Sequence, residues 1–205
     1  MKNNCLITIL LTAASATQLQ AVNVAVNGGF ETGDFTGWTQ FPSGIQIVGA
    51  FSPTEGNFAV NIDNSGNGAA NSIIKQSNLL AGSINPGDAI SVSFDMRGTT
   101  AVGGIVFAEF FSEIDGGGIS KSEILGGPLF ADADPNIWTS FSFNTTAGPD
   151  VSGGITLQLG AVTGAAEGSV ANVFYDNVKI DVVPEPASLG LFALSCLLFG
   201  ARRRR

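Results

Sequence analysis

Hydrophobic and polar residues alternate along short segments of this chain. In residues 91–97, Val92, Phe94 and Met96 are separated by polar residues, which is the two-residue period of a β-strand with one buried face. Alternation of this kind, or dense Val, Ile and Phe content, predicts eight strands, at 45–51, 58–62, 72–80, 89–97, 104–113, 138–145, 154–159 and 173–182. No segment between residues 22 and 181 has the 3.6-residue period of an amphipathic helix.

Turn-forming residues separate these segments. Clusters of Gly, Pro, Asn and Asp occur at 63–68, 85–88 and 115–118, and such residues favour tight turns. About 160 residues are enough to bury one hydrophobic core. Many short strands in one domain are typical of a sandwich or jelly roll. The sequence therefore predicts an all-β fold, a β-sandwich jelly roll over residues 22–181.

The N-terminal segment has the pattern of an export signal. Lys2 supplies a positive charge, residues 5–14 are mostly apolar, and Ala14-Ser15-Ala16 matches a small-residue cleavage site. Ala21 is an alternative cleavage position. We expect residues 1–21 to be a signal peptide that a signal peptidase removes, which would place the remaining chain outside the cytoplasm.

The C-terminal segment has three ordered features. A Pro184-Glu185-Pro186 motif precedes an apolar run at 187–201, and the chain ends on four arginines, Arg202, Arg203, Arg204 and Arg205. Fifteen apolar residues form a helix of roughly 22 Å, short for a hydrocarbon core of about 30 Å. Arginines tend to stay on the cytoplasmic side, so the helix would hold the domain outside the inner membrane.

Residues 182–205 resemble the PEP-CTERM sorting signal of Gram-negative bacteria, through the segment Val183 to Ser188, the short apolar helix and the arginine cluster. The resemblance implies that an exosortase recognises the Pro-Glu-Pro motif and processes the tail. It also implies transient anchoring in the inner membrane and delivery to the cell surface or the extracellular space. The alternative interpretation is a plain C-terminal membrane anchor.

The composition between these two segments excludes several classes of function. Cys5 and Cys196 lie in the segments themselves, so residues 22–181 contain no cysteine and form no disulfide. The same residues contain four basic side chains and 16 carboxylates, which leaves a net charge of −12. A nucleic acid partner is excluded because it requires a basic patch. Excess carboxylates outside the cell suit a hard divalent cation such as calcium.

Four further segments resemble the carbohydrate-binding jelly rolls of CBM families 4, 9 and 22, a galactose-binding-like fold. They are Asn27 to Trp38, Glu55 to Val60, Trp138 to Phe141 and Phe174 to Ile180. The resemblance implies a structural calcium ion that joins the first strand to the last. Its ligands in this chain would be Glu31, Glu55 and Asp176. The alternative is that these residues are ordinary carboxylates of turns.

A ligand-binding face is expected on the polar side of the central strands. Phe107, Glu109 and Phe111 share one face of segment 104–113, and Asp95 and Arg97 lie on the polar side of segment 89–97. Charged groups hydrogen-bond sugar hydroxyls, and a phenyl ring stacks on the apolar face of a pyranose. The alternative is an ordinary solvated sheet face. Both tryptophans, Trp38 and Trp138, are expected in the core.

Catalysis has little support in the sequence. The chain has no histidine, which excludes Ser-His-Asp, Cys-His and histidine-ligated zinc chemistry. A carboxylate pair such as Glu109 with Glu113 or Asp115 is the arrangement of a glycoside hydrolase, but acidic residues are too frequent here for the pairing to be informative. We therefore expect a non-catalytic, exported surface or matrix protein with a structural or interaction role. The alternative is a glycan-binding module that anchors exopolysaccharide.

Overall fold

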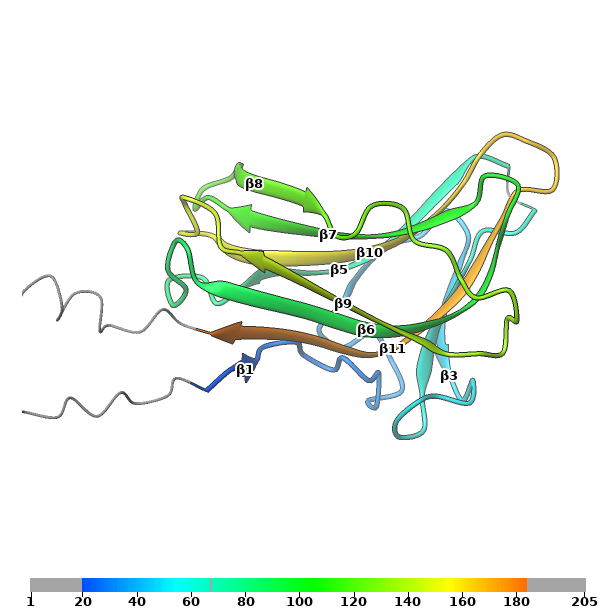
Figure 1. The fold of residues 1–205 in the computed structure, drawn as a ribbon, viewed down its shortest axis with the longest axis horizontal. Coiled ribbons are helices and arrows are strands. Elements are labelled where there is room, and N and C mark those ends of the chain that lie inside the picture. Colours follow the sequence, from blue (N-terminus) through cyan, green and yellow to red (C-terminus); the bar gives the residue numbers. More distant parts are fainter. Residues whose placement is uncertain (1–19, 67, 184–205) are drawn as a thin grey trace, which may run out of the picture. The chain divides into compact units, whose positions relative to one another are not determined.

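The computed structural model describes residues 20–66 and 68–183, and all of its regular elements are antiparallel β-strands in two sheets packed face to face (Figure 1). Sheet A contains, in spatial order, β3 (Ile45–Gly49), β4 (Ala59–Asp63), β11 (Val170–Val183), β6 (Ala89–Ala101) and β9 (Thr139–Thr146), and β1 (Val22–Asn23) pairs with β11. Sheet B contains β2 (Thr39–Phe41), β5 (Ala70–Leu79), β10 (Gly154–Thr163), β7 (Ile105–Glu113) and β8 (Ile119–Ile124). The predicted all-β sandwich is confirmed.

All eight predicted strands are present, with ends that differ by a few residues. Three strands were not predicted. β1 and β2 have two and three residues, too few for a period to be visible. β8 has the sequence Ile-Ser-Lys-Ser-Glu-Ile, which is polar because it lies at the edge of its sheet and has little apolar surface to bury.

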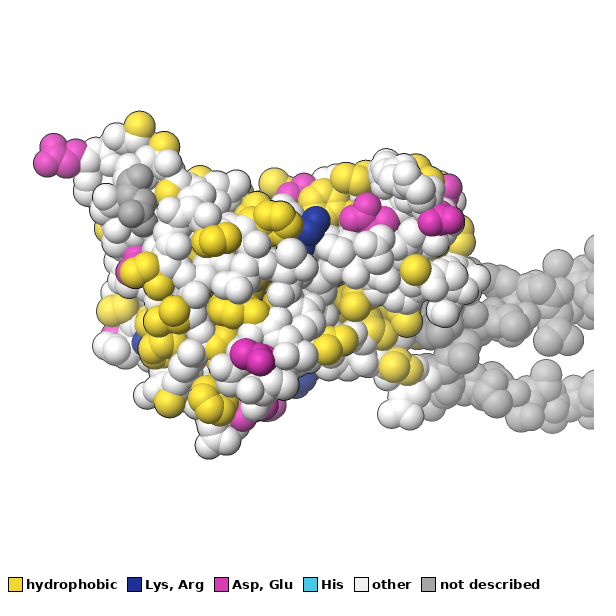
Figure 2. Space-filling view, turned by 180° about the vertical axis from the view of Figure 1, so that it is seen from behind, with side chains coloured by type: hydrophobic (Ala, Val, Ile, Leu, Met, Phe, Trp, Pro, Cys, Tyr) yellow, Lys and Arg dark blue, Asp and Glu magenta, His cyan; other side chains and the backbone are white. Residues whose placement is uncertain are grey.

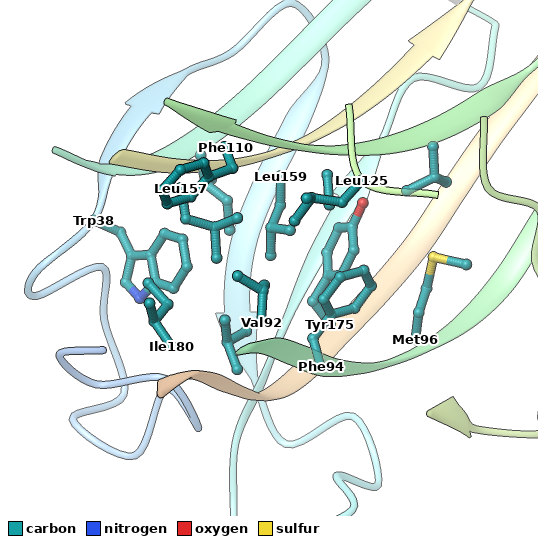
Figure 3. Close-up of a cluster of buried hydrophobic side chains, with 14 of the residues drawn as sticks. Trp38, Val92, Phe94, Met96, Phe110, Leu125, Leu157, Leu159, Tyr175 and Ile180 are labelled. Atoms are coloured by element: carbon teal, nitrogen blue, oxygen red, sulfur yellow. The ribbon is translucent and has the colours of Figure 1, made fainter. Parts of the chain in front are cut away.

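The core lies between the two sheets and is built from alternate residues of their strands (Figure 3). On β6 the residues Val92, Phe94 and Met96 are at most 1% exposed, and on β7 Val106, Ala108 and Phe110 are fully buried. Each large apolar side chain contributes about 1.5–3 kcal/mol when it is fully buried. Residues at the intervening positions of these strands therefore point away from the core.

Tyr175 is the largest fully buried side chain. Its hydroxyl donates a hydrogen bond to the backbone oxygen of Gly160 across the core, at 3.2 Å. Burial raises the pKa of Tyr175 far above its usual value, so the hydroxyl remains neutral. This bond connects β11 of sheet A to β10 of sheet B.

The two tryptophans have different environments. Trp38 is 6% exposed and stacks on Phe30, with ring centroids 5.5 Å apart, as predicted. The prediction for Trp138 is wrong, because it is only half-buried and lies outside the core on sheet A. The register explains this: Phe141 and Phe143 point inward, so the two-residue period directs Trp138 outward.

The predicted signal peptide and sorting tail fall almost entirely outside the described residues. This applies to residues 1–19 and to residues 184–205, which include the Pro-Glu-Pro motif, the apolar run and the four arginines. Within 20–66 and 68–183 no helix is long and apolar enough to cross a membrane.

Candidate functional site

The outer face of sheet B carries a row of apolar groups that crosses four strands. The register pairs Phe107 of β7 with Gly160 of β10, Gly160 with Ile73 of β5, and Ile73 with Phe41 of β2. We call these four residues the apolar row. Phe41 is 47% exposed, and Phe107 and Ile73 are partly exposed. The row is therefore accessible from solvent.

Gly160 creates the space for the Phe107 ring. A Cβ atom built on Gly160 would lie 2.3 Å from both Cε1 and Cζ of Phe107, so the ring tip occupies the position where a side chain would be. Phe107 thus leans across the neighbouring strand. Any other residue at position 160 would displace it.

A polar row lies beside the apolar row, two residues further along the strands. It consists of Glu109 of β7, Gln158 of β10 and Lys75 of β5, which are paired by register. Two residues of a strand span about 7 Å, so the rows are neighbours. Gln158 Nε2 donates to Glu109 Oε2 and Ser122 Oγ donates to Glu109 Oε1, both at 2.7 Å. These bonds fix the carboxylate, and each oxygen keeps lone pairs for a further donor.

Lys75 has a dual environment. Its Nζ atom lies 5.3 Å from the centroid of the Phe41 ring, so the ammonium group connects the polar row to the apolar row. In Figure 1 β7 and β10 bend upward toward the right, and the outer face of sheet B lies on the inside of this bend. The two rows together form an amphipathic surface that is suited to a ligand with an apolar side and a hydroxyl-rich side.

The predicted ligand face is divided between the two sheets. Phe107, Glu109 and Phe111 alternate with the buried residues of β7 and lie on the outer face of sheet B. Asp95 and Arg97 alternate with the buried residues of β6 and lie on the outer face of sheet A. The core separates these outer faces, so the five residues do not form one groove. Alternation identifies the face of a strand but does not identify its sheet.

Arg97 is the centre of a separate cluster on sheet A. Its guanidinium lies 4.2 Å from the centroid of Phe174 and 5.1 Å from that of Trp138. It donates hydrogen bonds to the backbone oxygens of Phe51 (2.7 Å) and Pro135 (3.2 Å). Partial burial lowers the pKa of Arg97 below its usual value. Because the guanidinium is stacked on aromatic rings and bonded to two loops, we interpret it as a structural clamp.

Asp95 also makes bonds that hold loops in place. Its Oδ1 accepts from Ser140 Oγ at 2.5 Å, and its Oδ2 accepts from Thr54 Oγ1 at 2.8 Å and from Asn177 Nδ2 at 3.2 Å. Asp95 is 7% exposed. These contacts connect β6 to β9, to the loop after β3 and to β11, and they favour a structural role for Asp95.

Two of the three predicted calcium ligands lie on either side of Gly29. A Cβ atom built on Gly29 would lie 3.7 Å from Asp176 Oδ1 and 3.7 Å from Glu31 Cγ. Asp176 is fully buried, and its Oδ2 accepts from the backbone N–H groups of Thr54 (2.7 Å) and Glu55 (3.1 Å). Both distances are ordinary van der Waals contacts, so the two side chains border the position of Gly29 from the first segment and from β11.

Glu31 is held by backbone amides. Its oxygens accept from the N–H groups of Phe58 and Asn57, each at 2.9 Å. These hydrogen bonds, with that of Phe58 as the larger cause, lower the pKa of Glu31. A Cβ atom on Gly56 would lie 2.2 Å from the Glu31 carboxyl carbon, so the packing of Glu31 requires glycine at position 56.

The contact of Glu55 with Asp176 is a hydrogen bond from its backbone N–H and does not involve the Glu55 carboxylate. In the part of the chain that the structure describes, no three His, Cys, Asp or Glu side chains form a group that could hold a metal ion. A site made of three carboxylates therefore does not fit these residues. The oxygens of Glu31 and Asp176, with nearby backbone carbonyls, remain a donor set of the kind that calcium prefers.

The comparisons with known proteins concern the two parts of the chain separately. Residues 182–205 match the PEP-CTERM protein-sorting motif, which confirms the resemblance found in the sequence and indicates an exported protein. No curated protein matches the sequence.

Solved structures with the same fold include three carbohydrate-binding modules. The CBM22-1 xylan-binding domain of Paenibacillus barcinonensis Xyn10C has a TM-score of 0.55 and 12% identity, over 77% of this chain and 92% of that one. TmCBM61, solved in complex with β-1,4-galactotriose, has a TM-score of 0.54 and 18% identity, over 78% and 97%. The C-terminal family 22 module of Clostridium thermocellum Xyn10B has a TM-score of 0.54 and 13% identity, over 82% and 97%. The chain therefore combines a PEP-CTERM sorting motif with a β-sandwich of the fold found in carbohydrate-binding modules.

Proposed function

We propose that this protein is exported to the surface of a Gram-negative cell and holds an exopolysaccharide or another surface glycan on the outer face of sheet B, without cleaving it. The observation that carries the proposal is the apolar row beside the polar row. The sequence favoured a structural or interaction role, with glycan binding as the alternative. The geometry favours glycan binding, because Phe107, Ile73 and Phe41 form a continuous apolar row beside a carboxylate that is held in place.

The two rows match the two kinds of surface on a sugar. Phe107 and Phe41 offer rings for the apolar C–H face of a pyranose; a pair of stacked aromatic rings is worth about 0.5–1.5 kcal/mol beyond area burial, and we take the same order for a sugar on a ring. Glu109 offers fixed acceptors to sugar hydroxyls, and a hydrogen bond to a charged group is worth about 1.5–3 kcal/mol. Two of the similar modules are a xylan-binding domain and a complex with β-1,4-galactotriose, which supports a glycan as the ligand.

The proposal assigns no catalytic step. Gln158 and Ser122 hold Glu109 by hydrogen bonds, which makes it suited to accept hydrogen bonds. The similar solved structures named above are binding modules. Incubation of the mature protein with its ligand should release no reducing ends, and such release would assign a hydrolase instead.

Delivery is proposed to follow from the sorting motif. A signal peptidase would remove the N-terminal segment, and an exosortase would process the tail after transient anchoring in the inner membrane. The mass of the protein from cells with and without exosortase tests this step. The expected result is a shorter chain only where exosortase is present, and an identical, uncut chain in both would refute processing.

A glycan-binding assay with a matched pair of variants tests the proposed binding face. Phe41 is 47% exposed on sheet B and Ile47 is 46% exposed on sheet A, so their replacement by Ala removes similarly exposed apolar groups from opposite faces. Affinity electrophoresis of the mature protein in polysaccharide gels should show weaker retardation for Phe41→Ala and none of this loss for Ile47→Ala. Equal retardation of both variants and the wild type would refute the assignment to sheet B.

We also propose a structural calcium ion between Glu31 and Asp176, supported by the oxygen donors that these two carboxylates bring to the position of Gly29. Such an ion would join the segment before β2 to β11 and so stabilise the closed sandwich. It would supply no chemistry to the proposed binding face.

A further inference from the structure

The apolar part of the binding face is unusually rich in branched aliphatic side chains. Besides the two phenylalanines and Ile73 of the apolar row, Ile105 and Val162 pair across β7 and β10, and Ile124 pairs with Glu109 and is 52% exposed. Ile105 and Val162 are at positions that alternate with buried residues, and Ile124 lies on the same face because it pairs directly with Glu109. The aliphatic groups thus flank the phenyl rings on the same face.

Tyrosine and tryptophan are not part of this face. The only tyrosine of the chain is buried in the core, Trp38 is also in the core, and Trp138 lies on sheet A. Phenyl and aliphatic groups offer no hydrogen bond. A sugar hydroxyl placed over them would lose its bonds to water without replacement, which is costly.

We propose that the glycan on this face is a neutral polysaccharide whose sugars carry methyl groups, either as 6-deoxyhexoses or as O-acetylated sugars. This inference rests on the proposed function. A methyl group in place of a hydroxyl turns the edge of the sugar over Ile73 and Phe107 into apolar surface. Its burial there is favourable, whereas burial of the hydroxyl is not. The opposite edge keeps its hydroxyls for Glu109 and Gln158.

The charges on the face indicate that the glycan is neutral. Of the four basic residues between positions 22 and 181, only Lys75 lies on the outer face of sheet B, where Gln158 separates it from Glu109. Figure 2 shows the surface from behind, where hydrophobic side chains gather with few Lys or Arg among them. With 16 carboxylates in the domain, a polymer of uronic acids would be repelled.

Matched ligand pairs test the methyl groups directly. The mature protein is titrated with oligosaccharides of 6-deoxymannose and of mannose, and with acetylated and deacetylated xylan, and polygalacturonate serves as the acidic polymer. Each methyl group buried on the face should tighten binding about fourfold, and two should give about sixteenfold. The first pair reports on the 6-deoxy source and the second on the acetyl source, while polygalacturonate should not bind.

Ile73→Thr is the variant that identifies the contact. Threonine keeps the β-branched shape that suits a strand but exposes a hydroxyl, so the preference for the methylated member should fall toward one. The control, Ile47→Thr on sheet A, should keep the preference. If both members of each pair bind equally well, the glycan-binding function stands and the methyl inference is wrong. If no member binds and a broad glycan array is also negative, the proposed function itself is wrong.

Discussion

The replacement of Gly160 by alanine should weaken glycan binding while leaving the fold intact. Gly160 does not have a left-handed backbone conformation, so alanine introduces no backbone strain. The added Cβ would lie 2.3 Å from two ring atoms of Phe107, whereas ordinary carbon contacts begin near about 3.5 Å. The ring must therefore move by about 1 Å or more, and it can do so because Phe107 is partly exposed.

The expected magnitude follows from what the displaced ring contributes. Loss of one aromatic stacking contact costs about 0.5–1.5 kcal/mol, which is about 2- to 12-fold in affinity. Stability should change little. Overpacking costs about 1–3 kcal/mol in a tight core, but a surface ring can turn away, and alanine recovers about 0.5–1 kcal/mol over glycine in a strand. The net change in unfolding free energy should stay within about 1 kcal/mol.

Titration calorimetry and thermal melting of the mature protein measure both quantities. Gly164→Ala is the matched control, because a Cβ there meets nothing within 4 Å and its backbone is also not left-handed. In a double-mutant cycle, Gly160→Ala should have no further effect once Phe107 is already alanine. Wild-type affinity for Gly160→Ala, or a loss that persists without the Phe107 ring, would refute the reasoning.

Three further predictions concern stability. Amide hydrogen bonds lower the pKa of Glu31 in the folded state. Its contribution to stability is therefore present above the usual carboxyl pKa and is lost as the pH falls through the lowered value. Urea unfolding between pH 6 and 2 should show this loss of stability, and in Glu31→Gln the unfolding free energy should depend less on pH. If calcium binds at Glu31 and Asp176, EDTA should lower the melting temperature by roughly 5–10 °C relative to calcium at about 100 times its Kd, and unchanged melting would exclude the ion. Arg97→Lys should lower the free energy of unfolding by about 1–2 kcal/mol, since lysine cannot keep both stacking contacts and both hydrogen bonds. The fluorescence emission of Trp138 should also shift to the red. An unaltered spectrum and stability would refute the structural role of Arg97.

The sequence predicted the local structure well because alternation directly reflects burial. Val92, Phe94 and Met96 point inward as expected, and so do Val106 and Phe110. The same pattern placed Phe107 and Glu109 on an accessible side. This much of the binding face could be recognised from a single strand.

What the sequence could not provide is the pairing of strands. β6 and β7 are consecutive, and consecutive strands often pair, yet they belong to different sheets. Because the chain changes sheets between β6 and β7, Asp95 and Arg97 lie on a different face from Glu109. The sequence also gives no sign of the partners that complete the face, since only the strand register places Gln158 beside Glu109 and Lys75 beside Gln158. Gly160 gave no signal of its own, because its role depends on a ring in another strand.

The arrangement of the sheets also separates attachment from binding. β11 belongs to sheet A and ends at Val183, directly before Pro184, and β1 pairs beside it through Val22 and Val182. The proposed binding face lies on the outer side of sheet B, with the core between it and β11. Because neither row uses a residue of β1 or β11, removal of the two terminal segments leaves every group of the face in place. Sorting can therefore change where the domain is held without changing what it binds.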